Sequence, residues 1–573
     1  MATSPFQTRT NRPRRNILVR GCILPRRDSF VAFAVYAVAA SLLFGGPLVE
    51  GGVHCLCVEG TKDEGIFVWS FAWWPYAIRH GLNPFYTHLI YAPQGFDLAH
   101  GTVVPGPALI LAPVTEIAGP LFSYNLAMLL SPVLAAYFAF LLCRRLARSF
   151  WPALLGGWLF GFSTYMIGQL TEHPNLTLVF LIPAIVHLVL RGIAGEISSR
   201  RLVLLLTLAL VVQFSISVEV LASLTLFGTG SLCVAYFTSD RDARERIAKI
   251  GLVIVAAYVA TAVIALPYLY YALQPGGVPV VASSADKFAT DLLGPVIPTR
   301  ITYLGGLALP TISNSFTALF AERDAYLGIP LIVMIAVAIR EGRHHPGTRI
   351  TATALIAIFI CSLGAHLHVA GTPTIPLPWI LVDRLPGIGL MLPSRFIVYC
   401  DLGAALLVAT WVGRTRYRWA AWTLAIMAVL SLAPAVRRGY WNSVLPIPKL
   451  FTSTAYRQAF RPADTVLVLP VGISGQSMLW QAEAHFGFRM ASGYVVPPTA
   501  PDPYKHFAID PTLTFGIRVP HEDTAAATFL SEEHITVAML AADAARHSPW
   551  ESIFKHLGWK ATVRDGAILF RPI

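Results

Sequence analysis

A succession of long apolar runs constrains this chain more than any other feature of its sequence. A helix needs about 20 apolar residues to cross a bilayer, and runs near that length recur between residues 29 and 436. Only 13% of the residues are charged, whereas soluble domains carry roughly 25%. The chain is therefore expected to be an α-helical polytopic membrane protein. We predict eleven spans with these approximate extents: 29–50, 121–143, 151–169, 176–191, 202–219, 220–237, 250–272, 326–340, 350–369, 395–413 and 419–436.

The basic loops predict how these spans are oriented, because membrane proteins retain Lys and Arg on the cytoplasmic side. Five basic clusters fall on alternate loops, on the same predicted side as the arginine-rich N-terminus. They contain Arg144, Arg145 and Arg148; Arg191, Arg200 and Arg201; Arg241, Arg244, Arg246 and Lys249; Arg340, Arg343 and Arg349; and Arg414, Arg416 and Arg418. We therefore place the N-terminus in the cytoplasm and, since the number of spans is odd, the C-terminal segment outside.

The same bias accounts for the formal net charge of +12, so membrane lipids are expected as partners and nucleic acid is not. The apolar run behind the basic N-terminus is long for the core of a signal peptide, and no small-x-small cleavage site follows it. We interpret it as an uncleaved signal anchor. The protein is expected in the bacterial inner (plasma) membrane.

One apolar segment, 103–119, is not counted as a span. It contains Pro105, Pro107, Pro113 and Glu116. If it crossed the membrane, every later loop would change sides and the arginine bias would be reversed. We expect an interfacial or re-entrant helix on the outer face; a spanning helix with a miscounted neighbour remains the alternative.

These assignments divide the chain into three parts. Residues 1–28 form a basic cytoplasmic N-terminus, and residues 29–436 form the transmembrane domain. The transmembrane domain carries a long first outer loop, 51–120, and another outer loop, 274–325, that is rich in Pro and Gly. Residues 437–573 are expected outside, as a small soluble α/β domain of ordinary size.

The C-terminal part alternates strand-like and helical patterns. Buried strands are predicted at 465–470 and 535–540, and a hairpin with an Asp-Gly turn at 561–570, because Asp-Gly between apolar runs is a strong hairpin signal. Helices are predicted at 474–486 and 522–533.

A short cysteine motif opens the first outer loop. His54, Cys55 and Cys57 spell H-C-x-C. Structural zinc sites use wider spacing and more ligands, so a metal site, a disulfide and two free thiols all remain open.

Ionisable residues gather at the predicted outer ends of the spans. Such residues at membrane depth are costly and often functional. They are Asp63, Glu64, Glu172, His173, Glu219, His366, His368, Arg384 and Arg395. Together they predict a polar cavity that opens outward.

The first outer loop also carries aromatic motifs. Its D-x5-W-x3-W pattern comprises Asp63, Trp69 and Trp73, and NPF at 83–85 and YAPQG at 91–95 follow. With Tyr124-Asn125-Leu126 in the second span, this layout resembles the GT-C glycosyltransferase superfamily, which includes protein O-mannosyltransferases and lipid A aminoarabinose transferases. The resemblance covers the first ~200 residues best, and the topology extends it.

The resemblance implies a fold and a reaction. It implies a GT-C-like helical domain with juxtamembrane helices in the first outer loop. It also implies an inverting transfer of a sugar from a polyprenyl-phosphate donor to an acceptor hydroxyl on a lipid, glycan or protein. Some members of the superfamily use a divalent metal, so Mg²⁺ or Mn²⁺ stays open here, and no metal ligands are assigned.

The implied chemistry suggests roles for individual residues. A positioned carboxylate can take the proton of the attacking hydroxyl, and Asp63 is the first choice, with Glu64 second. Cations should face the anionic leaving group, and Arg384, Arg395 and His173 are candidates. Further substrate-binding candidates are Glu172 and His366, and Trp69, Trp73 and Trp74 as a stacking surface. An interfacial aromatic belt is the alternative interpretation of the tryptophans.

Two other classes of function stay open. No Walker A loop and no G-x-G-x-x-G motif occurs, so ATP-driven transport and a nucleotide-sugar site have no support. A lipid or solute transporter or flippase would normally show two related halves, which we do not find. The third possibility is a non-catalytic scaffold for envelope assembly.

Overall fold

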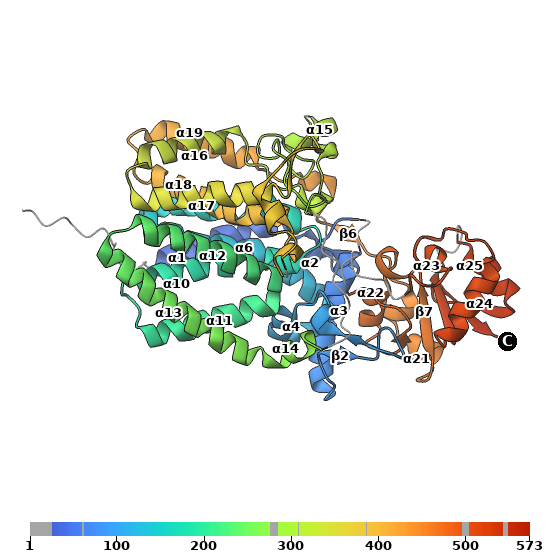
Figure 1. Cartoon of the computed structure of the whole chain (residues 1–573). Helices are drawn as coiled ribbons and strands as arrows, with labels where there is room; N and C mark the ends of the chain where they lie inside the picture. The colour runs from blue at the N-terminus through green and yellow to red at the C-terminus, as the bar shows by residue number, and fades with distance from the viewer. Residues whose placement is uncertain are drawn as a thin grey trace, which may run out of the picture.

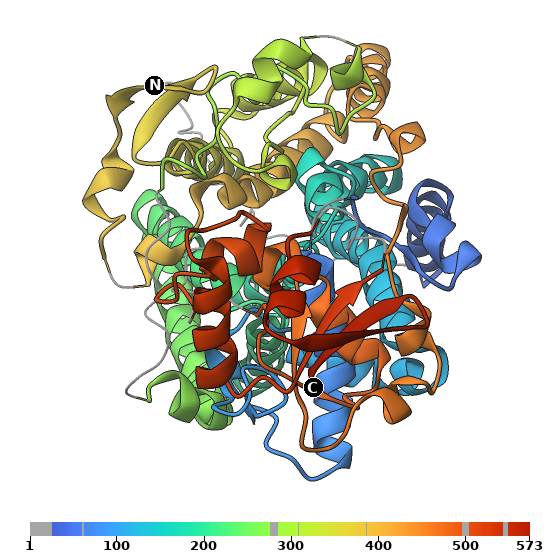
Figure 2. The ribbon, with the colours of Figure 1, turned by 90° about the vertical axis from the view of Figure 1, so that its right-hand side faces the viewer.

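A computed structural model describes residues 26–59, 62–274, 285–307, 309–385, 387–495, 504–542 and 548–573. The arginines of the N-terminus before residue 26 lie outside the described residues. Most helices run in roughly one direction as a bundle, and the C-terminal part of the chain lies at one end of that bundle (Figure 1). Seen from that end, the C-terminal strands and helices stand in front of the bundle (Figure 2).

Each predicted span coincides with a helix or a helix pair. These are α1 (Arg26–Phe44), α6 (Pro120–Ala147), α7 (Phe150–Gly161) with α8 (Thr164–Gln169), α9 (Pro174–Thr177) with α10 (Leu181–Ile193), α11 (Ser199–Ile216), α12 (Val218–Thr238), α13 (Arg241–Ile264) with α14 (Leu266–Ala272), α16 (Ile329–Gly342), α17 (Pro346–Ser362), α18 (Ile397–Val412) and α19 (Arg418–Ser431). Within the described residues, seven helices are long and apolar enough to cross a membrane. Helices α7, α16, α17 and α19 are shorter than these seven, so the count of eleven spans remains a prediction.

The segment 103–119 forms two short helices, α4 (Pro105–Ile110) and α5 (Ala112–Ala118). Each has a proline in its first turn, where the missing N–H costs nothing. At 1.5 Å per residue, neither is long enough to cross a bilayer. They pack beside α3 (Asp63–Arg79) and α6.

Two breaks in the bundle shape the region around residue 170. Helix α7 ends at Gly161, and Ser163 caps the start of α8, its side chain accepting a hydrogen bond from the Met166 N–H at 3.3 Å. Gly168 lets α8 approach another segment, because a Cβ there would come within 2.7 Å of the Ala321 carbonyl oxygen. The chain then turns at Glu172 and His173 before Pro174 starts α9.

The C-terminal part contains a five-stranded sheet in the order β10-β11-β9-β7-β8. Its strands are β7 (Thr465–Leu469), β8 (Arg489–Met490), β9 (Val537–Ala541), β10 (Trp559–Arg564) and β11 (Ala567–Pro572). Strand β7 pairs in parallel with β8 and β9, and β11 pairs antiparallel with β9 and β10. Strands β7, β9, β10 and β11 lie at the positions that the apolar runs and the Asp-Gly turn predict, whereas β8 was not predicted. The predicted helices correspond to α22 (Ser477–Glu483) and α24 (Glu522–Glu532).

The C-terminal part packs against the long first loop, residues 51–120. Helix α22 packs on α3, and Trp69 Nε1 donates to Gln481 Oε1 at 2.7 Å. Backbone of the loop also lies along β8, since the Met490 N–H donates to the Leu89 carbonyl at 2.9 Å. Loop and C-terminal part therefore share one hydrophobic core.

Cys55 and Cys57 form a disulfide. The metal and free-thiol alternatives for H-C-x-C are therefore excluded by this structure. The Leu56 N–H between the two cysteines donates to Asn125 Oδ1 at 2.8 Å, which ties the start of the loop to α6.

Candidate functional site

A cavity of about 930 Å³ lies between the bundle, α3 and α4, and the C-terminal part. Its lining includes these polar residues: Asp63, His173, Asn175, Glu219, Lys287, Glu322, Arg395 and Tyr494. Another part of the lining is apolar and comes from α4, α11, α13 and α14: Leu109, Val211, Phe214, Ile264 and Tyr268. The cavity thus has a charged region on one side and an apolar wall, built from the apolar helices of the bundle, on the other.

Asp63 is the first residue of α3 and faces this cavity. A carboxylate at a helix N-terminus is favoured by the helix dipole. Tyr494 donates its hydroxyl hydrogen to Asp63 Oδ1 at 2.8 Å, and His173 Nε2 lies 3.2 Å from Oδ2. Burial acts to raise the pKa of Asp63, but the hydrogen bonds and charge of His173, the Tyr494 hydroxyl and the charge of Arg395 outweigh it and hold that pKa below its usual value. Asp63 is therefore ionised at neutral pH.

Glu64 points elsewhere. Neighbouring residues of a helix do not face the same direction, and Glu64 is 1% exposed on the side of α3 that meets α22. Its Oε1 accepts a hydrogen bond from Gln476 Nε2 at 2.9 Å. Asp63, the first choice from the sequence, lines the cavity, and Glu64, the second, does not.

Glu172 and His173 complete an acidic and imidazole cluster. With Asp63 they bring one ligand atom each to within 4.8 Å of one another. Burial raises the pKa of Glu172, with further contributions from the charges of Asp63 and Glu322, and His173 opposes the shift. Burial lowers the pKa of His173, but Glu172 and Asp63 outweigh it and raise that pKa above its ordinary value.

Gln169 determines which nitrogen of His173 carries a proton. Its Nε2 donates to the Ala321 carbonyl at 3.1 Å and to Asp324 Oδ2 at 3.3 Å, so its Oε1 faces the His173 ring. That oxygen lies 2.9 Å from Nδ1 and can only accept. Nδ1 therefore donates, and the Nε2 position faces Asp63.

This arrangement gives His173 two useful states. As an imidazolium it donates to Gln169 through Nδ1 and to Asp63 through Nε2. As a neutral ring protonated at Nδ1, it presents the Nε2 lone pair to the space shared with Asp63 and Glu172. A ring nitrogen fixed by an acceptor on its other nitrogen, beside two carboxylates, is a donor set that suits Mn²⁺ or Zn²⁺.

Arg395 lines the cavity, but two carboxylates already form ion pairs with its guanidinium. Its guanidinium pairs with Glu219 through NH1 and with Glu322 through Nε and NH2. One cation between two carboxylates leaves no surplus positive charge for a phosphate. The prediction that Arg395 binds the leaving group is therefore not supported by its contacts, and we interpret it as a residue that holds α12 and the loop 320–322 against α18.

Lys287 is the cation that sequence reasoning missed. It is exposed, it lines the cavity, and no ion pair involves it within the described ranges of the chain. It lies in the loop 274–325, whose charged residues gave no motif, so no signal in the sequence marked it.

The expected stacking role of Trp69 and Trp73 is wrong. Their rings stack on each other with centroids 5.3 Å apart, and Phe486 packs edge-on against both. They are 0% and 1% exposed, because the C-terminal part covers this face of α3. Trp74, one residue on, does line the cavity.

His366 and Arg384 are not brought to the cavity. His366 starts β4 (His366–Val369), which pairs with β5 (Thr372–Pro376), and its Nδ1 lies 3.0 Å from Asp286 Oδ2. Arg384 is exposed on a turn. Neither belongs to the lining, so their predicted substrate contacts are not supported.

The helical bundle carries a long first loop with short helices, and the C-terminal part of the chain lies at one end of the bundle. Comparison with known proteins gives the family: the model of a domain of unknown function, DUF6311, matches residues 37–433. The chain belongs to this family. No curated protein sequence matches it.

Several solved structures resemble this chain in fold. The oligosaccharyltransferase AglB of the archaeon Archaeoglobus fulgidus, in its apo form, matches with a TM-score of 0.53 and 10% identity over 92% of this chain and 71% of AglB. The same protein solved with Zn and sulfate gives 0.51 and 10% identity over 94% and 73%. Its complex with an inhibitory peptide and a dolichol-phosphate gives 0.51 and 11% over 95% and 74%. The mycobacterial arabinofuranosyltransferase AftD gives 0.51 and 14% identity over 96% of this chain and 42% of AftD.

Proposed function

We propose that this protein is an inverting GT-C glycosyltransferase that moves a sugar from a polyprenyl-phosphate donor to an acceptor hydroxyl on the extracytoplasmic side of the membrane. The observation that carries the proposal is the cavity in which an ionised Asp63 faces a wall of membrane-helix side chains. A water-soluble sugar donor has no hydrocarbon chain to pack against these apolar side chains. The solved neighbours, one of them complexed with a dolichol-phosphate, support this reading through their fold.

The donor has two chemically different parts, and the cavity offers a surface for each. The isoprenoid would lie against the apolar residues of α11, α13 and α14, such as Phe214 and Ile264. The phosphate would meet Lys287, whose charge no acid neutralises among the described residues. A cation at that place stabilises the negative charge that grows on the leaving phosphate.

The residues near Asp63 suggest how the transfer runs. The acceptor oxygen forms a bond to the anomeric carbon while the bond from that carbon to the phosphate oxygen breaks. Asp63 takes the hydroxyl proton as that oxygen becomes acidic. Tyr494 and His173 hold the Asp63 carboxylate by its two oxygens, so that its direction is fixed before the substrate arrives.

A divalent metal fits the same cluster. Asp63, Glu172 and His173 would hold it, with His173 binding through Nε2. When bound, such a cation would supply positive charge next to the reacting groups. One of the neighbouring structures was solved with Zn and sulfate. In this chain Asp63, Glu172 and His173 form a set of candidate metal ligands.

Metal affinity is expected to rise with pH. His173 must lose a proton to bind, and its pKa is raised above the ordinary 6.5. Binding of Mn²⁺ or Zn²⁺ should therefore strengthen by up to about tenfold per pH unit until the pH passes that raised pKa. Titration calorimetry on the purified protein, between about pH 6 and 8, measures this. The rise should be shallower in His173→Asn, where Glu172 is the remaining ligand with a raised pKa; an equally steep rise in that variant would place the titrating group elsewhere.

Lys287→Gln is expected to raise KM for the polyprenyl-phosphate sugar about tenfold, the usual worth of one charge-assisted hydrogen bond. kcat should fall as well, because the negative charge that Lys287 stabilises on the leaving phosphate grows during the transfer. Arg384→Gln is the matched control, since Arg384 is exposed but off the cavity. If Arg384→Gln raised KM and Lys287→Gln did not, the phosphate would lie at the place that the sequence suggested and not at Lys287.

A further inference from the structure

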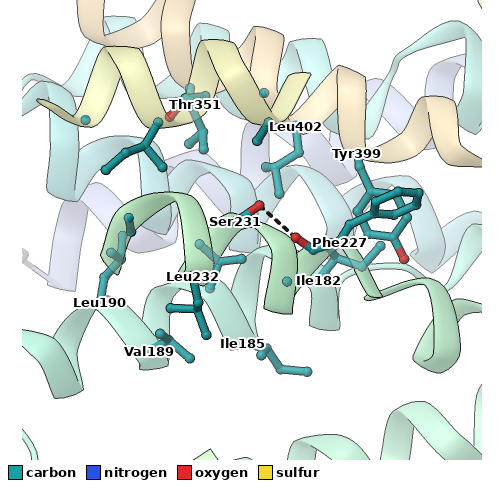
Figure 3. A pocket seen from close by; sticks show the side chains of 18 of the residues that line it. Ile182, Ile185, Val189, Leu190, Phe227, Ser231, Leu232, Thr351, Tyr399 and Leu402 are labelled. Atoms are coloured by element: carbon teal, nitrogen blue, oxygen red, sulfur yellow. Dashed lines mark hydrogen bonds between the residues drawn. The ribbon is translucent and has the colours of Figure 1, made fainter. Parts of the chain in front are cut away.

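A second cavity, of about 390 Å³, lies inside the helical bundle. Figure 3 shows its walls, which are built mainly from α10, α12, α17 and α18. The side chains that point into it are chiefly apolar, among them Ile185, Val189, Leu232 and Leu402. The hydroxyl of Ser231 is used within its own helix, where it donates to the Phe227 carbonyl at 2.7 Å. A space with so few free polar groups is poorly suited to water.

A floor separates this cavity from the candidate site. Tyr399 and Ser223 join their hydroxyls at 2.7 Å across α18 and α12, and the rings of Phe227 and Phe396 meet with centroids 4.9 Å apart. From this floor the second cavity extends toward the ends of the helices that lie away from Asp63. It is therefore not a branch of the proposed donor site.

Basic groups stand at its far end. Arg414 and His345 belong to the lining. Arg148 lies close by, because Gly413 packs against Ala147: a Cβ on that glycine would come within 3.1 Å of the Ala147 carbonyl oxygen. In the part of the chain that the structure describes, no carboxylate forms an ion pair with any of these three groups.

The electrostatics of this end point the same way. Burial lowers the pKa of Arg414, and the charge of Arg148 lowers it further. Burial likewise lowers the pKa of His345, and Arg414 adds to the shift. Arg414 and Arg148, two like charges held together without a counter-ion among the described residues, favour an anion from outside the chain, and the neutral His345 ring can donate one hydrogen bond to it.

We propose that this cavity holds an acyl chain of a membrane phospholipid whose anionic headgroup lies at Arg414 and His345. An apolar space within the bilayer favours a hydrocarbon chain. A basic mouth at the membrane surface favours a negatively charged headgroup, as basic pockets between membrane helices do elsewhere. The proposal is independent of sugar transfer, since it concerns neither the donor nor Asp63.

Two glycines of α12 provide a matched test. A Cβ at Gly228 or at Gly230 would meet nothing within 4 Å, but only Gly228 lines the cavity. Gly228→Phe should therefore fill the space without straining the helix, and Gly230→Phe adds the same ring outside it. Delipidated protein is incubated with an equimolar mixture of phosphatidylglycerol and phosphatidylcholine, and bound lipid is counted by native mass spectrometry. We expect one phosphatidylglycerol per chain in the unaltered protein and in Gly230→Phe, and its loss in Gly228→Phe.

The headgroup has its own pair of variants. Arg414→Gln should lower the preference for phosphatidylglycerol over phosphatidylcholine about fivefold, the factor expected for one cation near an anionic headgroup. Arg416→Gln should leave it unchanged, because Arg416 stacks on Tyr417 outside the cavity. The proposal is overturned by no retained phospholipid, by equal retention in the two glycine variants, or by an unchanged preference in Arg414→Gln. Polyprenyl phosphate, added to the same mixture in equal amount and retained in place of phospholipid, would also overturn it, because the cavity would then bind the lipid of the donor.

Discussion

Asp63→Asn is expected to lower the rate of sugar transfer by about 100- to 10,000-fold, the usual range for the loss of a general base. Asparagine keeps the size of the side chain but cannot take a proton. The rate is measured as release of polyprenyl phosphate from a radiolabelled polyprenyl-phosphate sugar by purified protein, which requires no knowledge of the acceptor's identity beyond a hydroxyl-rich membrane extract.

Glu64→Gln is the matched control for this variant. The two residues are neighbours, but Glu64 faces α22, and a glutamine there can still accept the hydrogen bond from Gln476. We expect nearly full activity. Full activity in Asp63→Asn, or equal losses in both variants, would contradict the assignment of Asp63 as the base.

Gln169→Leu is expected to weaken binding of Mn²⁺ or Zn²⁺ by about 10- to 100-fold, the range found when the partner of a metal-binding histidine is removed. Among the members of the cluster, the Gln169 side chain forms a hydrogen bond with His173, and the backbone contacts of Gln169 with Glu172 and His173 are unaffected by the substitution. Its loss frees the Nδ1 position and removes the preference for a lone pair on Nε2. The affinity is measured by titration calorimetry on the purified protein.

Gln213→Leu provides the control for a buried glutamine in the same bundle. Gln213 is 0% exposed, and neither of its side-chain polar atoms has a partner among the described residues. Replacing an unpaired buried amide with an apolar side chain is close to neutral or stabilising. Equal metal affinities in the two variants would mean that Gln169 does not set the state of His173.

The membrane helices could be predicted because an apolar run of about 20 residues is typical of a membrane span. Their interruptions could not. The break at Ser163 lies inside a stretch that is apolar on both sides, so no change of composition marks it. That break and the turn at 172–173 are what bring Glu172 and His173 beside Asp63, and the sequence offered them only as residues at the tip of a loop.

Contacts between residues far apart in the sequence were harder to predict than the helices. Tyr494 follows Asp63 by 431 positions, and nothing in the C-terminal sequence marks a tyrosine that reaches a membrane loop. The same docking explains the error on Trp69 and Trp73: an aromatic pair in a loop suggests a ligand platform, and only the position of α22 shows that the pair is core. The choice between Asp63 and Glu64 likewise required knowing which face of α3 is covered.

The central claim is that the cavity at Asp63 binds a polyprenyl-phosphate donor. A cryo-electron microscopy structure of the protein with added polyprenyl phosphate tests it most directly. The account predicts density for the phosphate beside Lys287, and for the isoprenoid along Phe214 and Ile264. Density for the lipid only outside this cavity, with none between Lys287 and Asp63, would contradict it.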